Sequence, residues 1–235
     1  NEQDFRSMDL ARFWKILFKQ ENLTDDKKVV EICTGLAPKV IYALALLNFK
    51  GQYYSFDFDK KVTIKLKSIF GNIKTGFSGK FISDYKQFEK INGIDYLVLN
   101  HGVDDLFLDT FCKLKKIRYC DYLSNAKSKT LLKIIQDNDK IYLLAIKEIT
   151  NIILDFSNNL KKDGFLMLSN YPPLIDIMRK DKVRIKLLEK VFDDVIKNLK
   201  KSGFEKKTVS QIKKVKSKDN KLKYWVILIN RGVKK

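Results

Sequence analysis

The chain has 235 residues, of which 45% are hydrophobic and 32% are charged, and its formal net charge is +19. This length suits one sizeable core and is short for two, so we expect a single domain over residues 1–235. The longest stretch without a charged residue, Gly164 to Ile175, is well below the roughly 20 residues that a membrane-spanning helix needs, which argues against a membrane protein.

Two features bear on the cellular compartment. The first residues include Glu2, Asp4 and Arg6 and lack the apolar core of a signal peptide, which argues against export. The three cysteines are Cys33, Cys112 and Cys120. They are an odd number without metal-ligand spacing, and a single histidine cannot complete a Cys/His cluster. We therefore expect a cytoplasmic protein without a bound metal.

The N-terminal segment, residues 1–27, contains apolar residues at helical spacing, namely Leu10, Phe13, Trp14 and Leu17. Charged residues occupy positions between them, which is typical of a helix with one apolar face. An amphipathic helix is therefore predicted before the first strand. It could pack against the core or act as a lid over a ligand.

A strand, a glycine turn and a helix are predicted within Val29–Phe49. The β-rich run that starts at Val29 leads into a turn at Gly35, and Pro38 stands in the first turn of the next helix. The following strand ends in Asp57, 22 residues after Gly35, where an acid can accept hydrogen bonds from two ribose hydroxyls. This arrangement predicts a nucleoside-binding site.

The residues of this turn argue against a dinucleotide ligand. Cys33 and Ala37 occupy two positions at which the dinucleotide fingerprint has glycines that leave room for a pyrophosphate. Glu31, at the end of the first strand, would repel phosphate but can hold a cationic ligand or orient the turn. A pyrophosphate is therefore a poor fit.

Helices and strands continue to alternate along the rest of the chain. Asp59–Phe70 predicts a helix that Asp59 could cap. Val103–Gln136 predicts one or two extra helices before a longer helix over Asp139–Asn159. Parallel strands with right-handed crossovers bind their ligand at the carboxyl ends of the strands, where the strand order reverses. The candidate residues are expected at those ends.

The order of an acid, a turn glycine and a second acid after the next strand resembles the class I S-adenosylmethionine (SAM)-dependent methyltransferases. Lys80–Tyr85 is similar to the end of the third strand of that family, and Ile94–His101 to the fourth strand and the start of the loop that faces the transferred methyl. Leu160–Leu168 is similar to a helix end, turn and fifth strand. Leu199–Phe204 and Tyr224–Ile229 resemble the last helix and the terminal antiparallel pair. The resemblance implies a three-layer Rossmann-like α/β sandwich with a seven-stranded, mostly parallel sheet, an N-terminal helix and a helical insertion over residues 103–136.

The same resemblance implies SAM as the cofactor. In the family the first acid and the glycine loop hold the methionine part, the second acid holds the ribose, and an acid after the third strand lies near the adenine amino group. The residues at cofactor-contacting positions of this sequence are Glu31, Cys33, Gly35, Leu36, Asp57, Phe58, Ser83, Asp84 and Asn100.

The acceptor is expected to bind after the fourth strand. His101 is the single imidazole and lies just beyond that strand, where it could act as a general base or serve a structural role. Asp104 and Asp105 could bind a cationic acceptor or cap the next helix. Tyr171 is predicted as a further acceptor contact. The insertion over 103–136 either builds the acceptor pocket or only completes the packing.

The basic residues leave the class of acceptor open. Lysine far outnumbers arginine, and the densest basic region is Lys197–Lys223. Such a region is the footprint of an RNA-binding surface, but an AT-rich genome or a thermophilic proteome also produces a lysine-rich composition.

We expect SAM-dependent methyl transfer to a small-molecule acceptor. An enclosed pocket lined by Phe107, Phe111 and Tyr171 would favour this function. The alternatives are an RNA methyltransferase, an aminopropyl transferase on the same fold and a SAM-binding protein without catalysis. Lysines that converge on the cofactor site would favour RNA, and acids that converge there would favour a polyamine. The sequence does not set the oligomeric state.

Overall fold

The computed structural model of the chain describes residues 2–118, 125–171, 181–207 and 225–232. It contains a seven-stranded sheet in the order β3-β2-β1-β4-β5-β7-β6. The strands are β1 (Lys28–Ile32), β2 (Gln52–Phe56), β3 (Ser78–Ile82), β4 (Ile94–Asn100), β5 (Leu160–Ser169), β6 (Phe204–Lys207) and β7 (Trp225–Asn230). The predicted α/β class and strand number are confirmed.

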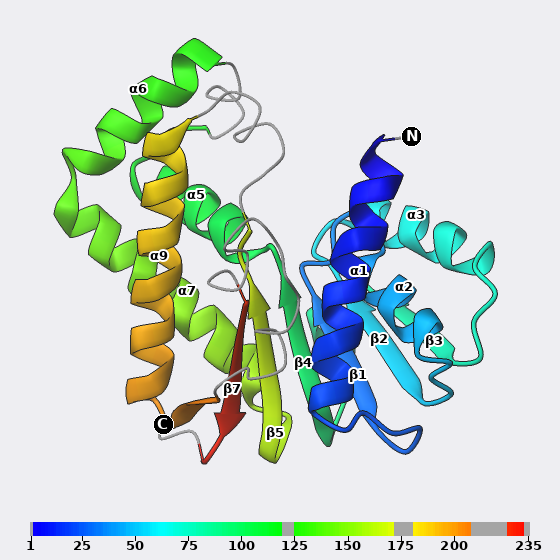
Figure 1. Ribbon diagram of the computed structural model, residues 1–235. Helices are drawn as coiled ribbons and strands as arrows, with labels where there is room; N and C mark the ends of the chain where they lie inside the picture. Colours follow the sequence, from blue (N-terminus) through cyan, green and yellow to red (C-terminus); the bar gives the residue numbers. More distant parts are fainter. Residues whose placement is uncertain (1, 119–124, 172–180, 208–224, 233–235) are drawn as a thin grey trace. The chain divides into compact units, whose positions relative to one another are not determined.

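The direction of the strands follows the predicted pattern. β1 pairs in parallel with β2 and with β4, and β2 pairs in parallel with β3. The arrow of β7 points opposite to that of β5 in Figure 1, as expected for a terminal antiparallel pair. The chain passes from β1 outward to β3 and then returns to β4 on the other side of β1. The strand order therefore reverses between β1 and β4, which is where such sheets bind ligands.

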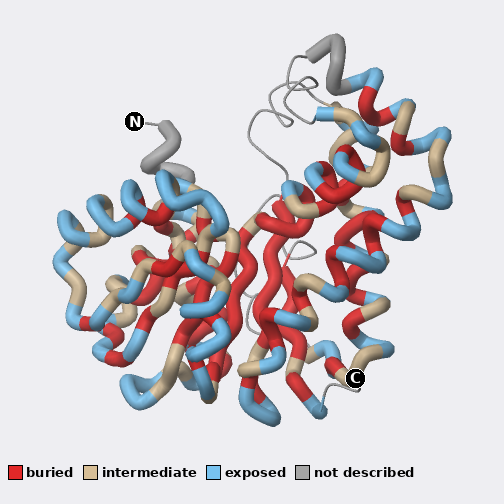
Figure 2. The backbone as a smooth tube through the Cα atoms, turned by 180° about the vertical axis from the view of Figure 1, so that it is seen from behind, coloured by how far each residue is buried: buried red, intermediate tan, exposed pale blue. Residues whose placement is uncertain are grey.

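The central strands are buried because their residues are almost all apolar. All seven residues of β4 are buried, and β7 is buried at five of its six positions. Figure 2 shows that buried residues concentrate along the central strands. Continuous burial of this kind is typical of parallel sheets, whose two faces are both covered.

The chain divides into two compact units. The first comprises Asn1–Asn100, Asn159–Leu168 and Glu205–Arg231, and the second comprises His101–Asn158, Ser169–Phe204 and Gly232–Lys235. The first unit contains most of the sheet with the helices α1 (Glu2–Gln20), α2 (Lys39–Leu46), α3 (Lys60–Gly71) and α4 (Tyr85–Phe88). The second contains the helices α5 (Val103–Leu114), α6 (Asn125–Gln136), α7 (Asp139–Ser157) and α9 (Lys182–Lys201).

The N-terminal helix α1 packs within the first unit. Trp14, Leu17 and Phe18 are buried, and α1 lies against α2. The Trp14 ring meets Trp225 of β7 edge-on, with the ring centroids 4.7 Å apart. α1 is therefore an integral part of the core, whichever further role it has.

The second unit is held together by aromatic packing between its helices. Phe107 and Phe111 of α5 are fully buried, and their ring centroids lie 5.9 Å apart. Phe107 also meets Tyr142 of α7 edge-on at 5.4 Å. The two predicted extra helices exist as α5 and α6, and these two phenylalanines belong to the core between helices.

One predicted boundary was wrong. Leu160–Leu168 was expected to contain a helix end and a turn, but the strand β5 occupies this whole segment. The turn lies earlier, at residues 158–159. Asp163 adopts a positive φ of 61° within the strand, and a side chain at Gly164 would meet the Lys161 carbonyl oxygen at 2.9 Å. The Asp-Gly pair therefore forms an irregular position inside a strand, although it is typical of turns.

Candidate functional site

Glu31, at the carboxyl end of β1, is a buried acid with only 1% of its surface exposed. The Tyr53 hydroxyl of β2 donates a hydrogen bond of 2.6 Å to Glu31 Oε2. The other oxygen, Oε1, is buried and has no hydrogen-bond partner in the described part of the chain. A buried acceptor without a donor is costly unless a ligand or water supplies one.

Glu31 favours its neutral form, because burial penalises the charged carboxylate. Burial raises the pKa of Glu31 to about 8, and the Tyr53 hydroxyl, the Lys39 ammonium group and the Asn100 amide offset this rise only in part. Burial and the neighbouring Glu31 in turn raise the pKa of Tyr53 well above its usual value. A cation placed beside Glu31 would reverse the balance and favour the carboxylate.

Gly35 and Asp57 join the two loops that follow β1 and β2. The Gly35 backbone N–H donates to Asp57 Oδ2 at 3.0 Å, and the Asp59 N–H donates to Asp57 Oδ1 at 2.9 Å. Gly35 has a φ of +58°, and a Cβ atom added there would meet nothing within 4 Å. The turn therefore needs glycine for its backbone conformation and leaves open space at its surface.

Cys33 stands where the dinucleotide fingerprint has a glycine, yet its backbone has the conformation of that glycine. Its φ is +54°, and its N–H donates to the Phe56 carbonyl oxygen at 2.9 Å. A side chain in this left-handed region costs roughly 1–2 kcal/mol. The loop therefore keeps its shape without the glycine, at a cost in stability.

Asn100, the last residue of β4, is held by a residue of the N-terminal helix. The Trp14 indole Nε1–H donates to Asn100 Oδ1 at 3.2 Å, across 86 positions of sequence. This bond fixes the amide plane and directs its NH₂ group away from Trp14. The Asn100 amide and the Tyr53 hydroxyl both favour the Glu31 carboxylate. Glu31, Tyr53, Asn100 and Trp14 thus form one buried polar cluster in the first unit.

Sequence reasoning missed Tyr53, Lys39 and Trp14. Strand periodicity could have found Tyr53, because residues 53, 55 and 57 point to the same side of β2. Ser55 is also part of this region, since its hydroxyl lies 3.1 Å from that of Thr34. No comparable pattern indicates Trp14, whose bond to Asn100 depends on how the helix packs.

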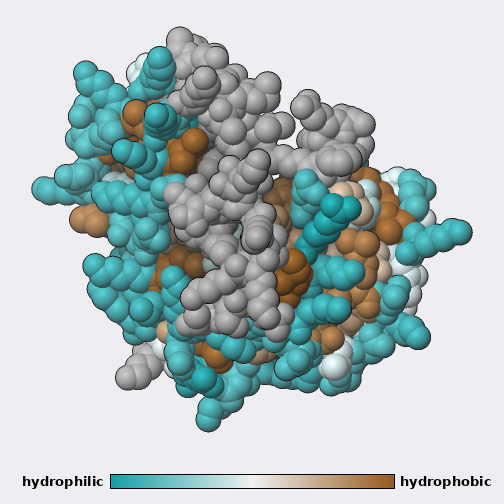
Figure 3. All heavy atoms as spheres, in the orientation of Figure 1, coloured by the Kyte–Doolittle hydropathy of each residue, from teal (hydrophilic) through white to brown (hydrophobic). Residues whose placement is uncertain are grey.

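The other predicted cofactor residues surround the ends of the strands with mixed exposure. Leu36 and Phe58 are exposed at 47% and 59%, and the Phe58 ring meets Phe56 edge-on at 5.0 Å. Ser83 is half-buried just after β3. Asp84 is exposed and caps α4, because its Oδ1 accepts from the Lys86 N–H at 3.0 Å. Hydrophilic side chains cover most of the coloured surface in the view of Figure 3, with hydrophobic patches between them.

His101, Asp104 and Tyr171 form a second group, within the second unit. His101 has a φ of +57°, and its ring stacks on Tyr171 with the centroids 4.6 Å apart. His101 Nδ1 lies 3.6 Å from Asp104 Oδ1, and only 2% of the Asp104 side chain is exposed. The His101 N–H donates to the Ser169 carbonyl oxygen at 2.8 Å, which fixes the backbone. Neither aspartate is the N-cap of α5, which is Gly102, and Asp105 is exposed in the first turn.

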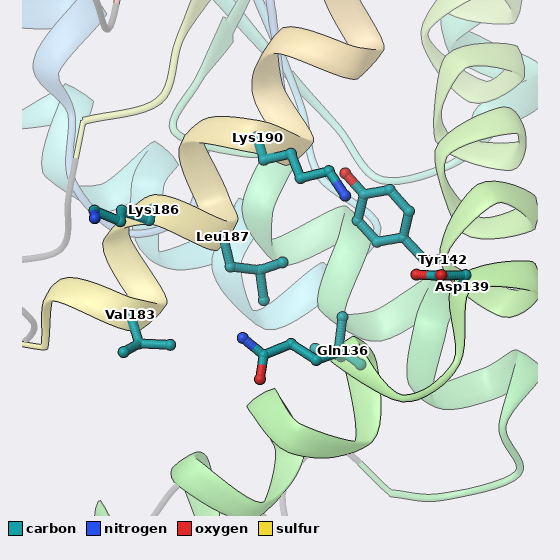
Figure 4. A pocket seen from close by; sticks show the side chains of 8 residues that line it. Gln136, Asp139, Tyr142, Val183, Lys186, Leu187 and Lys190 are labelled. Atoms are coloured by element: carbon teal, nitrogen blue, oxygen red, sulfur yellow. The ribbon is translucent and has the colours of Figure 1, made fainter.

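A separate hollow of about 350 Å³ lies between α7 and α9 in the second unit (Figure 4). Lys190 points over the Tyr142 ring at 4.4 Å, and the Tyr142 hydroxyl donates to Asp194 at 2.7 Å. Asp139 and Gln136 also line this hollow, and Lys186 extends away from them. Tyr142 pairs with Lys190 and Asp194 of α9, and these contacts are sufficient to explain the hollow as packing between helices.

The described residues form neither a metal-binding cluster nor a membrane-spanning helix. No group of three or more histidine, cysteine, aspartate or glutamate side chains in the described ranges is arranged to hold a metal ion. No described helix combines the length and the apolarity needed to cross a membrane.

Comparison with solved structures identifies the fold. The chain is similar to the plantazolicin methyltransferase BpumL in complex with SAH, with a TM-score of 0.52, 12% identity, and coverage of 98% of this chain and 88% of that chain. It is also similar to a SAM-dependent O-methyltransferase from Thermotoga maritima, with a TM-score of 0.50, 9% identity, and coverage of 95% and 66%. The chain has the fold of the class I SAM-dependent methyltransferases. No protein-family model matches its sequence, and no characterised protein matches it as a relative.

The first unit places three polar residues at the carboxyl ends of neighbouring strands. Its sheet reverses order between β1 and β4, and the buried Glu31 and Asn100 lie at the ends of those two strands. Asp57 follows β2, the other neighbour of β1. Glu31, Asp57 and Asn100 are therefore grouped at the carboxyl ends of neighbouring strands in the first unit.

Proposed function

We propose that this methyltransferase fold is an active enzyme that transfers the methyl group of SAM. The observation that carries the proposal is the pair of acids at the ends of β1 and β2. Glu31 has a buried oxygen without a donor, and Asp57 lies beside the open turn of Gly35. Two acids of different exposure suit a ligand with a buried cationic end and a ribose.

The residues present fit SAM in charge and in polarity. Glu31 and the loop from Cys33 to Leu36 would hold the cationic methionine part, since a positive charge lowers the cost of the buried carboxylate. The two oxygens of Asp57 each accept one backbone bond and retain lone pairs for the ribose hydroxyls. Phe58 would contribute apolar surface for the adenine, with Ser83 and Asp84 at its polar edge.

When bound, SAM supplies an activated methyl group on a sulfonium, so the protein mainly has to align the acceptor and manage its proton. His101, which follows Asn100 directly in the chain, is the proposed base that removes the proton of the acceptor. Asp104 Oδ1 lies 3.6 Å from Nδ1, which is longer than a hydrogen bond, and a carboxylate there would stabilise the imidazolium that forms when Nε2 accepts the proton. Stacking on Tyr171 restricts rotation of the imidazole. The positive φ at His101 is the kind of local strain that clusters at functional sites.

For the acceptor we propose a small molecule that contacts Tyr171, Asp104 and Asp105. Burial of Tyr171 and Asp104 supports an acceptor that enters a restricted space, because a large polymer reaches exposed groups more readily. Phe107 and Phe111 are not part of this proposal, since both are fully buried in the helical core. RNA is a second candidate, because four lysines line a hollow beside the edge strand β3.

Isothermal titration calorimetry with SAH and SAM tests the proposal. We expect binding of one molecule of each per chain, and no binding of NAD, because Cys33 and Ala37 replace two glycines that leave room for a pyrophosphate. Absence of SAM and SAH binding at millimolar concentration would overturn the proposal. Incubation with tritium-labelled SAM and either a metabolite extract or total RNA then identifies the acceptor class by the fraction that becomes labelled.

A further inference from the structure

A second hollow in the first unit, of about 500 Å³, is lined by four lysines and by no acid. We call it the lysine pocket, and its charged residues are Lys28, Lys67, Lys80 and Lys90. They come from β1, α3, β3 and the segment after α4. β3 is the edge strand of the sheet, so the pocket lies at that edge.

The aromatic ring of Tyr54 holds two of these ammonium groups in place. Lys80 Nζ lies 5.5 Å from the ring centroid, and Lys28 Nζ lies 5.9 Å from it. Lys28 Nζ also donates to the Asn92 carbonyl oxygen at 2.5 Å. Contact with a ring face attracts a cation without neutralising its charge. The two lysines are therefore positioned while their charge remains available to a ligand.

None of the four lysines forms an ion pair with a carboxylate in the described ranges. Asp95 of β4, the strand beside β1, does not neutralise the Lys28 side chain. Its carboxylate accepts from the Lys28 backbone N–H and pairs with Lys27 and Lys161. The basic region that the sequence indicated is different. Lys207 pairs with the buried Glu21 at 2.5 Å, and residues 208–224 lie outside the described part of the chain.

The pocket is separate from the proposed cofactor site. Tyr53 and Tyr54 are successive residues of β2, so their side chains point to opposite faces of the sheet. Tyr53 contacts Glu31, whereas Tyr54 lines the lysine pocket. Lys80 pairs with Tyr54 in the strand register and therefore shares its face. A ligand of the pocket would not compete with SAM.

We propose that the lysine pocket binds the phosphodiester backbone of a single-stranded nucleic acid. An open hollow with four uncompensated positive charges favours a ligand whose negative charges are spread along its length, as one phosphate per nucleotide is. Tyr54 is half-buried and offers ring surface on which a base can stack. The amides of Gln87 and Asn92 add neutral hydrogen-bonding groups. The proposal concerns binding and does not rest on methyl transfer.

The test measures fluorescence anisotropy of labelled twelve-nucleotide oligouridine RNA and oligothymidine DNA with the whole chain, over a range of salt concentrations. The variant replaces the three exposed lysines, Lys67→Gln, Lys80→Gln and Lys90→Gln. We expect it to bind at least ~10-fold more weakly in low salt, and the slope of log K against log salt to fall by about 2, since each phosphate contact contributes ~0.7 for single strands. Stronger binding of one oligomer identifies RNA or DNA as the source.

A matched control removes the same charge elsewhere in the first unit. Lys19→Gln, Lys50→Gln and Lys162→Gln change exposed lysines outside the pocket. Equal weakening by both triple variants would assign the binding to net charge and overturn the proposal. Unchanged binding in the pocket variant would also overturn the proposal. Lys80, on the edge strand β3, would then serve to disfavour pairing with a strand of another chain. Tight binding of tripolyphosphate without binding of either oligomer would overturn the proposal in favour of a small polyanion.

Discussion

The backbone N–H of Gly35 donates to the carboxylate of Asp57 at 3.0 Å, and this bond links the loop after β1 to the loop after β2. The two residues were selected from the sequence for separate reasons, one for a turn and one for a ribose. Their contact shows that Asp57 also holds the shape of the glycine loop. Loss of this acid would therefore affect both the loop and the proposed ligand.

Asp57→Ala should weaken SAH binding by ~2–3 kcal/mol, because charge-assisted bonds to the ribose hydroxyls are lost. It should also lower the free energy of unfolding by about 1–2 kcal/mol through the two backbone donors that lose their acceptor. Calorimetry and urea denaturation measure the two effects. Asp59→Ala is the matched control, since Asp59 caps α3 through the Lys61 N–H. It should cost about 1 kcal/mol of stability and leave SAH affinity unchanged. Equal affinities in the Asp57 variant and the wild type would refute the ribose role.

Glu31→Gln should remove a pH dependence of stability. The pKa of Glu31 is about 8 in the folded chain and near 4.5 when unperturbed. Between these values the unfolded chain loses the proton while the folded chain keeps it, so the wild type loses stability as pH rises. Relative to Glu31→Gln, the wild type should become less stable by ~2–4 kcal/mol between pH 5 and pH 8. Denaturation curves at several pH values measure this. Parallel pH profiles of the two proteins would show that Glu31 ionises normally.

The raised pKa of Glu31 predicts that the protein releases a proton when SAM binds. A cation beside Glu31 favours the carboxylate, so at pH 7 the complex should lose a proton that the free protein holds. The observed binding enthalpy should then differ between Tris and phosphate buffers, which take up protons with different enthalpies. Glu31→Gln should bind with no such difference. A buffer-independent enthalpy in the wild type would contradict the placement of the cation at Glu31.

Much of this site could be predicted because its residues lie at the ends of strands. The acids at 31 and 57 follow β-rich runs, and the turn glycine lies between them at the expected spacing. The contact between Trp14 and Asn100 could not be predicted, because no local pattern joins residues 86 positions apart. Side-chain burial also depends on the folded packing. Phe107 and Phe111 therefore fit either a pocket wall or a core in the sequence, and the structure places them in the core.

Gly35→Ala should lower the stability by ~1–2 kcal/mol through its left-handed backbone, since a Cβ there meets no atom within 4 Å. It should weaken SAH binding by at least about tenfold if the ligand fills that open space. Cys33→Gly is the matched comparison, because glycine adopts the φ of +54° at this position without the steric cost of a side chain. We expect this variant to be as stable as the wild type or more stable, with SAH affinity retained. Unchanged affinity in Gly35→Ala would place the cofactor away from this turn.

His101→Asn should lower kcat by ~10²–10⁴ with little change in SAH affinity, because the proposed base is lost. Asparagine tolerates the positive φ at this position, so the fold should be retained. Asp104→Asn should also lower kcat, since a carboxylate 3.6 Å from His101 Nδ1 favours the imidazolium that the proposed step forms. The measurement is the rate of tritium transfer to the acceptor found with the wild type. If His101→Asn lowers the melting temperature but keeps the rate per folded molecule within a few-fold of the wild type, His101 is structural and the proton passes to Asp105 or to solvent.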